Sequence, residues 1–214
     1  MRAVVSGSAG GIGLAVAELF LARGWEVWGC DLLPSPLEHP RYQHVIHDIR
    51  DPLAAPPEAE VVVCNAGTLE EAEAIRVNLL ATIDFAEAFL DQPRLRSLLF
   101  IASASARNGA EFPRYVASKA GLVGYMKNRA LALAPRGVTC NSISPGGVVT
   151  GANRHILDSE TLYAAVKAET LLGKWAEPGE IAELAWYLTV VNRSITGEDI
   201  LIDNGEMLKS NFIW

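Results

Sequence analysis

Short runs of purely apolar residues alternate along this chain with longer stretches in which apolar residues recur at helical spacing. The apolar runs cover residues 3–5, 27–28, 45–46, 61–63, 98–101, 138–143 and 200–202. The helical patterns cover residues 11–23, 69–90, 114–134 and 178–190. Strands that are apolar throughout are covered on both faces, and intervening helices imply parallel pairing through right-handed crossovers. The pattern therefore predicts a doubly wound α/β fold with about seven parallel strands and helices on both faces.

Prolines interrupt this alternation in two of the connections. Pro34, Pro36 and Pro40 leave little room for a helix before residue 42, and three more prolines occur between residues 51 and 60. Neither a repeat nor a linker divides the 214 residues, and a chain of this length buries roughly 70% of the surface of its unfolded form. We therefore expect a single domain that spans residues 1–214.

Charge and cysteine usage narrow the functional class. The formal net charge is −7 and no basic run stands out, which argues against a nucleic-acid partner. No apolar stretch approaches the roughly 20 residues of a membrane helix and the chain begins with a strand-like run, so we expect a cytoplasmic protein without a membrane partner. Cys30, Cys64 and Cys140 are odd in number and far apart, which predicts buried, reduced thiols.

A glycine-rich segment follows the first apolar run and leads directly into a helical pattern. It runs from Ser6 to Gly13, and its candidate phosphate-binding residues are Gly7, Ser8, Gly11, Ile12 and Gly13. Glycines allow a tight turn and a close approach to a pyrophosphate, whose charge is met by the amides at the helix N-terminus. The glycine spacing alone is weak evidence, but a strand before it and a helix after it predict a dinucleotide site.

Asp31 ends the second apolar run, where a carboxylate accepts hydrogen bonds from the adenosine ribose hydroxyls. The glycine loop holds no Arg or Lys that could bind a 2′-phosphate. This favours NAD over NADP as the cofactor. The alternative is that Asp31 only begins a turn.

Tyr115 and Lys119 lie four residues apart in a helical pattern, which places both side chains on one helix face. A phenol with a pKa near its usual value of about 10 is a poor acid or base at neutral pH, but an adjacent ammonium favours the phenolate. The pair is therefore a candidate acid–base centre. Two solvated residues on a helix are the alternative.

The whole chain resembles the short-chain dehydrogenase/reductase family, whose motifs occur in the family's order from end to end. The matching segments are residues 6–13, Asp31, 48–49, 65–67 (NAG), 77–79 (VNL), 101–103 (IAS), 115–121 (YVASKAG), 141–146 (NSISPG), 178–182 (PGEIA), 195–197 (ITG) and 202–203 (ID). The resemblance implies a Rossmann-type fold and an NAD(H)-dependent oxidoreductase that acts on a secondary alcohol or its ketone.

The resemblance also implies roles for individual residues. Tyr115 would exchange a proton with the substrate oxygen, which Ser103 would hold by a hydrogen bond. Lys119 would lower the pKa of Tyr115 and bind the nicotinamide ribose, and Asn78 would anchor a water that relays protons to Lys119. Ser105 is the alternative to Ser103, which is preferred because it closes the apolar strand. Further implied cofactor contacts are Asp48, Ile49, Asn65, Ala66, Gly67, Pro145, Gly146, Val148 and Thr150.

The chain departs from the family pattern mainly by being shorter. The segment between Gly67 and Asn78 is reduced, and most of a helix after Asp31 is missing. Residues 147–176 resemble the family's mobile cover over the substrate. Arg154 in this lid could meet an anionic substrate or be a solvated charge, and His155 has no Cys or His at metal spacing, so no metal site is predicted.

The motifs are compatible with two functional classes. The main hypothesis is the oxidoreductase, and the alternative is a nucleotide-binding regulatory module on the same fold without catalysis.

The chain ends with five large apolar residues between 207 and 214, which predicts that this tail is buried. Because C-terminal segments of the family commonly pack between subunits, we expect a homodimer or homotetramer. Packing of the tail over the lid is the alternative.

Overall fold

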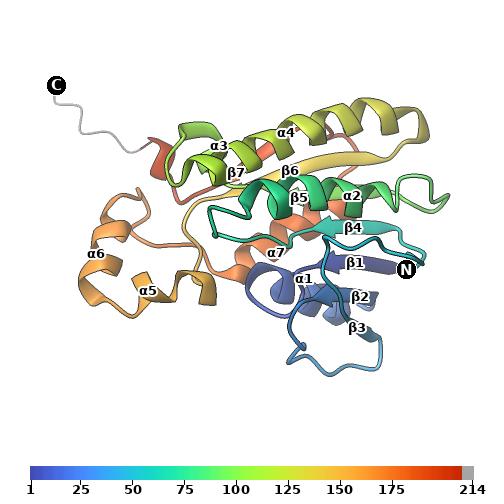
Figure 1. Ribbon diagram of the computed structural model, residues 1–214, viewed down its shortest axis with the longest axis horizontal. Coiled ribbons are helices and arrows are strands. Elements are labelled where there is room, and N and C mark those ends of the chain that lie inside the picture. Colours follow the sequence, from blue (N-terminus) through green and yellow to red (C-terminus); the bar gives the residue numbers. More distant parts are fainter. Residues whose placement is uncertain (209–214) are drawn as a thin grey trace.

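A computed structural model, which describes residues 1–208, shows one seven-stranded parallel sheet with helices on both faces (Figure 1). The strand order is β3-β2-β1-β4-β5-β6-β7, so the crossover direction reverses beside β1. The strands are β1 (Arg2–Ser6), β2 (Glu26–Asp31), β3 (Tyr42–Ile46), β4 (Val61–Cys64), β5 (Ser97–Ile101), β6 (Thr139–Pro145) and β7 (Asp199–Ile202). The α-helices are α1 (Gly11–Ala22), α2 (Thr82–Glu87), α3 (Ser105–Asn108), α4 (Pro113–Leu133), α5 (Arg154–Leu157), α6 (Glu160–Ala168) and α7 (Pro178–Trp186). The predicted fold class is confirmed.

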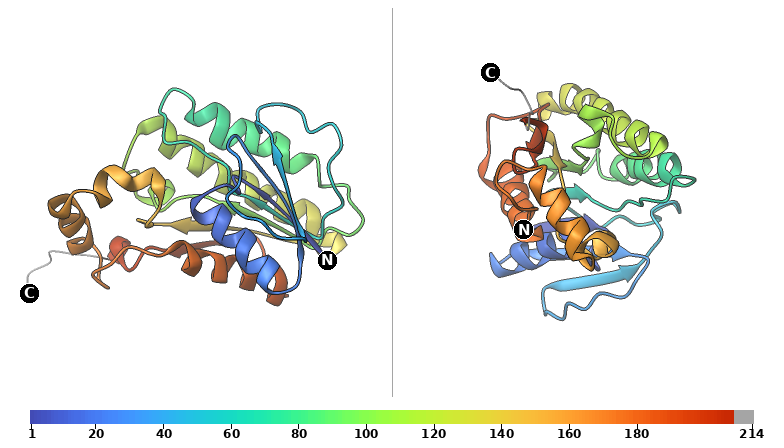
Figure 2. Two further views of the ribbon diagram at one scale, coloured as in Figure 1. Left: turned by 90° about the horizontal axis from the view of Figure 1, so that it is seen from below. Right: turned by 90° about the vertical axis from the view of Figure 1, so that its left-hand side faces the viewer.

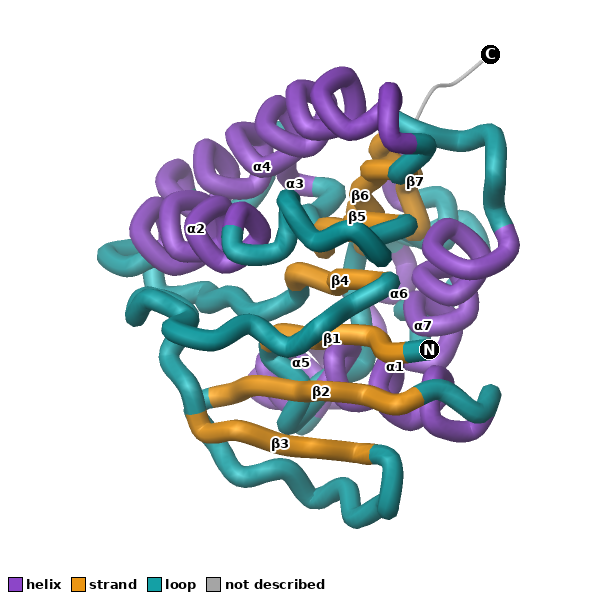
Figure 3. Tube along the Cα trace, turned by 90° about the vertical axis from the view of Figure 1, so that its right-hand side faces the viewer, coloured by secondary structure: helices purple, strands orange, loops and turns teal. Residues whose placement is uncertain are grey.

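The alternation of side chains along each strand builds two separate cores. Val4 points to the layer of α2 and α4, where Phe85, Phe100 and Met126 are buried with it. Its neighbour Val5 points to the layer of α1 and α7. Figures 2 and 3 show α1 and α7 side by side on one face of the sheet and α2 and α4 on the other. Strands that are covered on both faces account for the uniformly apolar runs in the sequence.

The proline-rich connections contain no helix, as the sequence predicts. Residues 32–41 and 47–60 are fully described and join β2 to β3 and β3 to β4 through turns and extended chain. The strand β3 therefore forms an edge of the sheet next to β2 alone. This leaves the carboxyl end of β2, with Asp31, open toward the glycine loop.

The predicted helix over residues 69–90 is wrong at its start. Helical structure begins at Ile75, and its first part, Ile75–Ala81, is a π-helix that continues into α2. The Asn78 amide explains the late start, because its Oδ1 accepts from the Thr68 N–H at 2.7 Å and its Nδ2 donates to the Thr68 carbonyl at 2.9 Å. These two bonds hold Thr68 in a loop. The C-terminal helix likewise changes from α7 to a π-helix over Tyr187–Val191.

The lid and the C-terminal turn lie outside the two helical layers of the sheet. The lid contains a 3₁₀ turn (Gly151–Asn153), α5 and α6, which project from one side of the sheet (Figure 1). A 3₁₀ turn at Glu206–Leu208 ends the described chain, and Leu208 is 77% exposed there. Contacts within the described chain therefore do not bury Leu208, and Phe212, Ile213 and Trp214 lie outside the described residues. None of the helices in residues 1–208 is both long and apolar enough to cross a membrane.

Candidate active site

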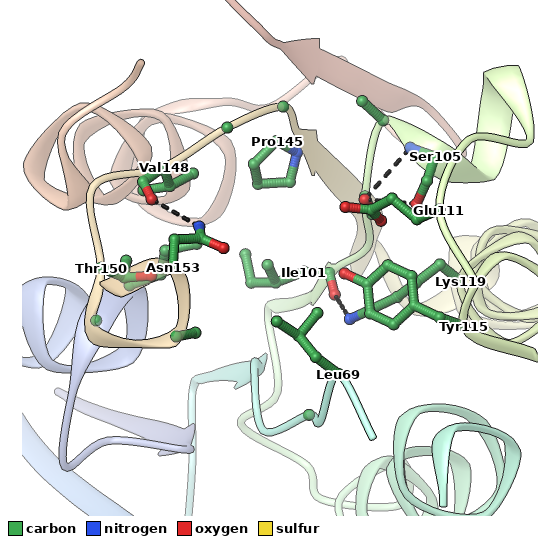
Figure 4. Close-up of a pocket in the computed structure, with 18 of the residues that line it drawn as sticks. Leu69, Ile101, Ser105, Glu111, Tyr115, Lys119, Pro145, Val148, Thr150 and Asn153 are labelled. Atoms are coloured by element: carbon green, nitrogen blue, oxygen red, sulfur yellow. Dashed lines mark hydrogen bonds between the residues drawn. The ribbon is translucent and has the colours of Figure 1, made fainter. Parts of the chain in front are cut away.

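A cavity of about 700 Å³ opens at the carboxyl edge of the sheet, beside the point where the crossovers reverse (Figure 4). Loops that follow β1, β4, β5 and β6 line it, together with the lid and the first turns of α1 and α4. Ligands of open α/β sheets bind at this topological switch point. The predicted residues that line the cavity are Gly7, Gly11, Ile12, Asp31, Asn65, Ala66, Gly67, Ser103, Tyr115, Lys119, Pro145, Gly146, Val148 and Thr150.

The glycine loop has the geometry of a phosphate cradle. Gly7 has a φ of +68°, and a Cβ on Gly13 would lie 2.0 Å from the Gly7 carbonyl oxygen, so a side chain at residue 13 would clash with the loop. The N-cap of α1 is Gly10, and no side chain caps it. The first amides of α1 therefore lack a side-chain acceptor and can bind an anion in the cavity.

Two side chains connect the loop to neighbouring strands. The Asp31 carboxylate accepts from the Ala9 N–H and from the Leu33 N–H, both at 3.0 Å, while it lines the cavity. The Asn65 amide donates to the carbonyls of Ser6 and Gly7 at 3.1 and 3.0 Å. These contacts fix the loop between β2 and β4, and they leave Asp31 further lone pairs for a ribose hydroxyl.

The segment that follows β5 brings two hydroxyl groups to the cavity. The Ser105 Oγ donates to the Ser103 Oγ at 2.8 Å, and the Ser105 N–H donates to the same oxygen at 3.3 Å. Ser103 and Ser105 both line the cavity. Because Ser103 accepts both of these hydrogen bonds, its own hydroxyl proton is available to a partner in the cavity.

Tyr115 and Lys119 approach this hydroxyl pair from α4. The Lys119 Nζ lies 5.8 Å from the centre of the Tyr115 ring and donates to the Ile101 carbonyl at 2.9 Å (Figure 4). Burial raises the pKa of Tyr115 to about 12, the Glu111 carboxylate adds to the rise, and a hydrogen bond with Ser103 opposes it. Burial also lowers the pKa of Lys119 to about 8, against the pull of Glu111.

The expected lowering of the Tyr115 pKa by Lys119 is therefore not found in this structure. Desolvation disfavours both charged forms, the phenolate of Tyr115 and the ammonium of Lys119. The Lys119 ammonium donates a hydrogen bond to the backbone carbonyl of Ile101, the last residue of β5. The group that lowers the pKa of Tyr115 here is Ser103.

Five predicted residues do not line the cavity. Asn78 is fully buried and its amide bonds to Thr68 and, at 3.3 Å, to the Ser118 hydroxyl. The Asp48 carboxylate is paired with Arg50, which lowers the pKa of Asp48. The other three are Ser8, Gly13 and Ile49. Gly13 still acts indirectly, by allowing α1 to approach Gly7.

The lid, with its conspicuous residues Arg154, His155 and Trp175, forms part of the cavity wall. Trp175 lines the cavity, whereas Arg154 and His155 do not. The Asn153 amide donates to the Val148 carbonyl at 2.8 Å and closes the turn that carries Thr150.

The acidic residues Glu111, Glu169 and Glu206 also line the cavity, and they come from three segments far apart in the sequence. The position of Glu111, four residues before Tyr115, is the one signal that could have identified any of them.

Comparisons with known proteins agree with this fold. The family model "Enoyl-(Acyl carrier protein) reductase" matches residues 54–206. A short chain dehydrogenase of Penicillium brasilianum, prhI, is 29% identical over 245 residues, which cover 94% of this chain and 95% of that protein. A 3-oxoacyl-[acyl-carrier-protein] reductase of Salmonella typhimurium is 27% identical, with 95% and 96% covered. These 245 aligned positions exceed the 214 residues here, as expected for a chain with shortened segments.

A solved structure of 4-hydroxyisoleucine dehydrogenase complexed with NADH has the same fold. It superimposes with a TM-score of 0.88 at 24% identity, and the match covers 98% of this chain and 99% of that one. The family match, together with the fold, identifies an oxidoreductase of the dehydrogenase/reductase class. The chain belongs to the short-chain dehydrogenase/reductase family, and it is an enzyme of that class.

Proposed function

We propose that this enzyme transfers hydride between NAD(H) and a secondary alcohol or its ketone, with Tyr115 as the acid–base group. The observation that carries the proposal is the convergence of Ser103, Tyr115 and Lys119 on the cavity that the glycine loop also lines. The idle regulatory module is not favoured, because the matched relatives are named dehydrogenases and reductases.

The residues present fit a nicotinamide dinucleotide. The uncapped N-terminus of α1 would hold its pyrophosphate, Asp31 its adenosine ribose, and Lys119 its second ribose. The nicotinamide, when bound, supplies or accepts the hydride. A 2′-phosphate would lie close to the Asp31 carboxylate, and this repulsion supports NAD as the preferred cofactor.

The chain's own residues would perform the proton chemistry. In the oxidative direction the Tyr115 phenolate would accept the proton of the substrate hydroxyl, and in the reductive direction the Tyr115 phenol would return that proton to the carbonyl oxygen. The Ser103 oxygen accepts two hydrogen bonds from Ser105, and its proton, which is directed to the Tyr115 oxygen in this structure, would also hold the substrate oxygen. Burial opposes the Tyr115 phenolate, so a positive charge near its oxygen would favour turnover.

The test of catalysis follows reduced-nicotinamide absorbance with a panel of secondary alcohols and their ketones. Tyr115→Phe should abolish turnover and keep the affinity for NADH nearly unchanged, because the ring still packs while the phenol is lost. Tyr187→Phe, which changes an exposed tyrosine outside the cavity, is the matched control. Turnover of Tyr115→Phe at the wild-type rate would remove Tyr115 from the mechanism.

The cofactor preference has a separate test. NADH should bind the wild type more tightly than NADPH, and Asp31→Ala should narrow that difference, whereas Asp51→Ala, an exposed residue outside the cavity, should leave it unchanged. Equal affinity of the wild type for both cofactors overturns the assignment.

We also propose a homodimer or homotetramer. The support is Leu208, which is 77% exposed in the described chain, together with the large apolar residues Phe212, Ile213 and Trp214 in the sequence after it. Sedimentation at micromolar concentration tests it, and a clean monomer refutes it. An oligomer that survives deletion of residues 207–214 refutes only the role of the tail.

A further inference from the structure

A group of hydrogen-bonded side chains behind the cavity wall joins the edge strand β3 to the glycine loop. The Tyr42 hydroxyl donates to the Ser8 Oγ at 3.0 Å, and the His44 Nδ1 lies 3.1 Å from the Tyr42 oxygen and 3.4 Å from the Ser8 Oγ. The His44 Nε2 lies 2.9 Å from the carbonyl oxygen of Leu33, in the segment after β2. Leu33 lines the cavity, whereas Ser8, Tyr42 and His44 lie behind its wall.

A glycine of β2 makes room for these side chains. The strands β2 and β3 lie side by side at the edge of the sheet (Figure 3), and Gly29 is paired with His44 in their register. A Cβ on Gly29 would lie 2.3 Å from the Ser8 Oγ and 2.6 Å from the Tyr42 hydroxyl oxygen. Any larger residue at position 29 would therefore displace both hydroxyls, and Gly29 allows β3 to reach the glycine loop across β2.

The donor and acceptor roles follow from the chemistry of the partners. A carbonyl oxygen only accepts, so the His44 Nε2 carries a proton, and the Nδ1 of the neutral ring is then an acceptor. Because the Tyr42 hydroxyl donates to Ser8, the Ser8 proton is left for this nitrogen. Ser8 is fully buried, and a buried hydroxyl without a partner is costly. The position of the His44 ring therefore constrains the Ser8 side chain.

The hydrogen bonds continue from His44 to the candidate ribose carboxylate. The Leu33 N–H donates to one Asp31 oxygen at 3.0 Å, and the other Asp31 oxygen accepts from the Ala9 N–H at 3.0 Å. Ala9 follows Ser8 in the chain, so these contacts form a closed circuit that includes His44. Ala9, Asp31 and Leu33 all line the cavity. One side chain behind the wall thus connects the phosphate cradle with the residue expected to bind the ribose.

The glycine loop needs such a support because its own backbone does not determine its shape. Gly7 and Gly11 have φ values of +68° and +52°, and Gly10 lies between them. Glycine has more conformational freedom to lose than any other residue, so a loop of this composition is costly to order. A loop that is already ordered when the dinucleotide arrives loses less entropy on binding and binds more tightly.

We propose that His44 is a positioning residue for the adenosine half of the cofactor. Its Nδ1 side orders the glycine loop through Ser8, and its Nε2 side orients Asp31 through Leu33. The inference rests on the proposed function, because it assumes that this loop binds a nicotinamide dinucleotide. The candidate catalytic residues take no part in these contacts, so loss of His44 should weaken cofactor binding and leave the hydride step unchanged.

The first experiment measures cofactor affinity by calorimetry, which does not need turnover. His44→Ala should raise the Kd for NADH and for ADP-ribose by about tenfold, because the loop must then be ordered on binding. Gln43→Ala changes an exposed side chain on the same strand and should leave both Kd values unchanged. In steady-state kinetics His44→Ala should raise the KM for NADH and keep kcat within about twofold of the wild type. Unchanged Kd values in His44→Ala overturn the inference.

The second experiment separates the two sides of the His44 ring. His44→Asn keeps an acceptor near the position of Nδ1 but is too short for the Leu33 carbonyl, so it should narrow the ratio of NADH to NADPH affinity. His44→Gln carries an N–H donor near the position of Nε2, so it should weaken both cofactors and keep the ratio. A histidine that served only the stability of β3 would leave the ratio unchanged in both variants, and that result overturns the inference.

A double-mutant cycle tests the contact between His44 and Ser8 directly. Ser8→Ala removes the hydroxyl that the Nδ1 of His44 accepts from. In the double variant the second substitution removes a hydrogen bond that is already broken, so the Kd for ADP-ribose should exceed that of His44→Ala by less than about twofold. Fully additive effects of the two substitutions would contradict the contact.

The outcomes distinguish this inference from the proposed function. Turnover of an alcohol or ketone together with unchanged Kd values in His44→Ala overturns the inference and leaves the proposed function intact. If no alcohol or ketone is turned over but the variants weaken ADP-ribose binding as expected, the inference holds and the proposed reaction fails. A wild type that binds NADH and NADPH equally overturns the role of His44 toward Asp31, and one that binds neither NADH nor ADP-ribose overturns both proposals.

Discussion

The buried ammonium of Lys119 should make the stability of this enzyme depend on pH in a way that a single variant can isolate. Burial lowers the pKa of Lys119 from 10.5 to about 8. Between these two values the unfolded chain holds more protons than the folded one, so the free energy of unfolding rises as the pH rises. Lys119→Met removes the titrating group and with it this part of the pH dependence.

The size of the effect follows from the shift. Each pKa unit corresponds to about 1.4 kcal/mol, so the full shift amounts to about 3 kcal/mol. From pH 7 to 9.5 the folded Lys119 loses nearly all its charge while the unfolded lysine remains mostly protonated. Over this range the wild type should gain about 2 kcal/mol relative to Lys119→Met. Tyr115 contributes little there, because its raised pKa lowers stability only above about pH 10.

The assay is equilibrium unfolding in urea at several pH values between about 7 and 9.5 for both proteins. Other titrating groups are common to both and cancel in the difference. Lys127→Met, which changes an exposed lysine on the same helix, is the control for the loss of a lysine side chain. A difference between Lys119→Met and the wild type that stays flat with pH would refute the claim that burial governs Lys119.

Three further predictions test the two site serines, the hydrogen bonds of Asp199 and the burial of the cysteines. Ser103→Ala should lower kcat by about a hundredfold or more through loss of a hydrogen bond to the substrate oxygen, while Ser105→Ala should lower it less than about tenfold; equal effects would contradict their separate roles. Asp199 accepts from two serine hydroxyls and from Arg107, so Asp199→Ala should lower the free energy of unfolding by about 2 to 3 kcal/mol in urea titration, and a change below about 0.5 kcal/mol would be inconsistent with that network. The three cysteines have pKa values raised by burial, so the native enzyme should not react with a thiol reagent at pH 8 until urea unfolds it.

The layers and the dinucleotide half of the site could be predicted from the sequence, because local rules determine them. A strand that is covered on both faces needs a uniformly apolar run. Residue 13 must be a glycine because α1 lies against the Gly7 carbonyl at that position. Prolines exclude helices from two connections through their own geometry. Tyr115 and Lys119 share a face because of the helix period. Each of these features depends on neighbours within a few residues.

The substrate half of the site depends on contacts between distant segments, and only the tertiary structure shows it. Glu111, Glu169 and Glu206 become neighbours because three separate connections end at one edge of the sheet. The pKa of Tyr115 follows the burial of the phenol, which no spacing reveals, and so its rise is opposite to the change expected from Lys119 alone. Asn78 keeps its place in a helix, and its amide contacts with Thr68 hold the start of the predicted helix pattern in a loop. Periodicity in the sequence records which face of an element is buried, whereas the charge and solvation of a cavity depend on all the segments that enclose it.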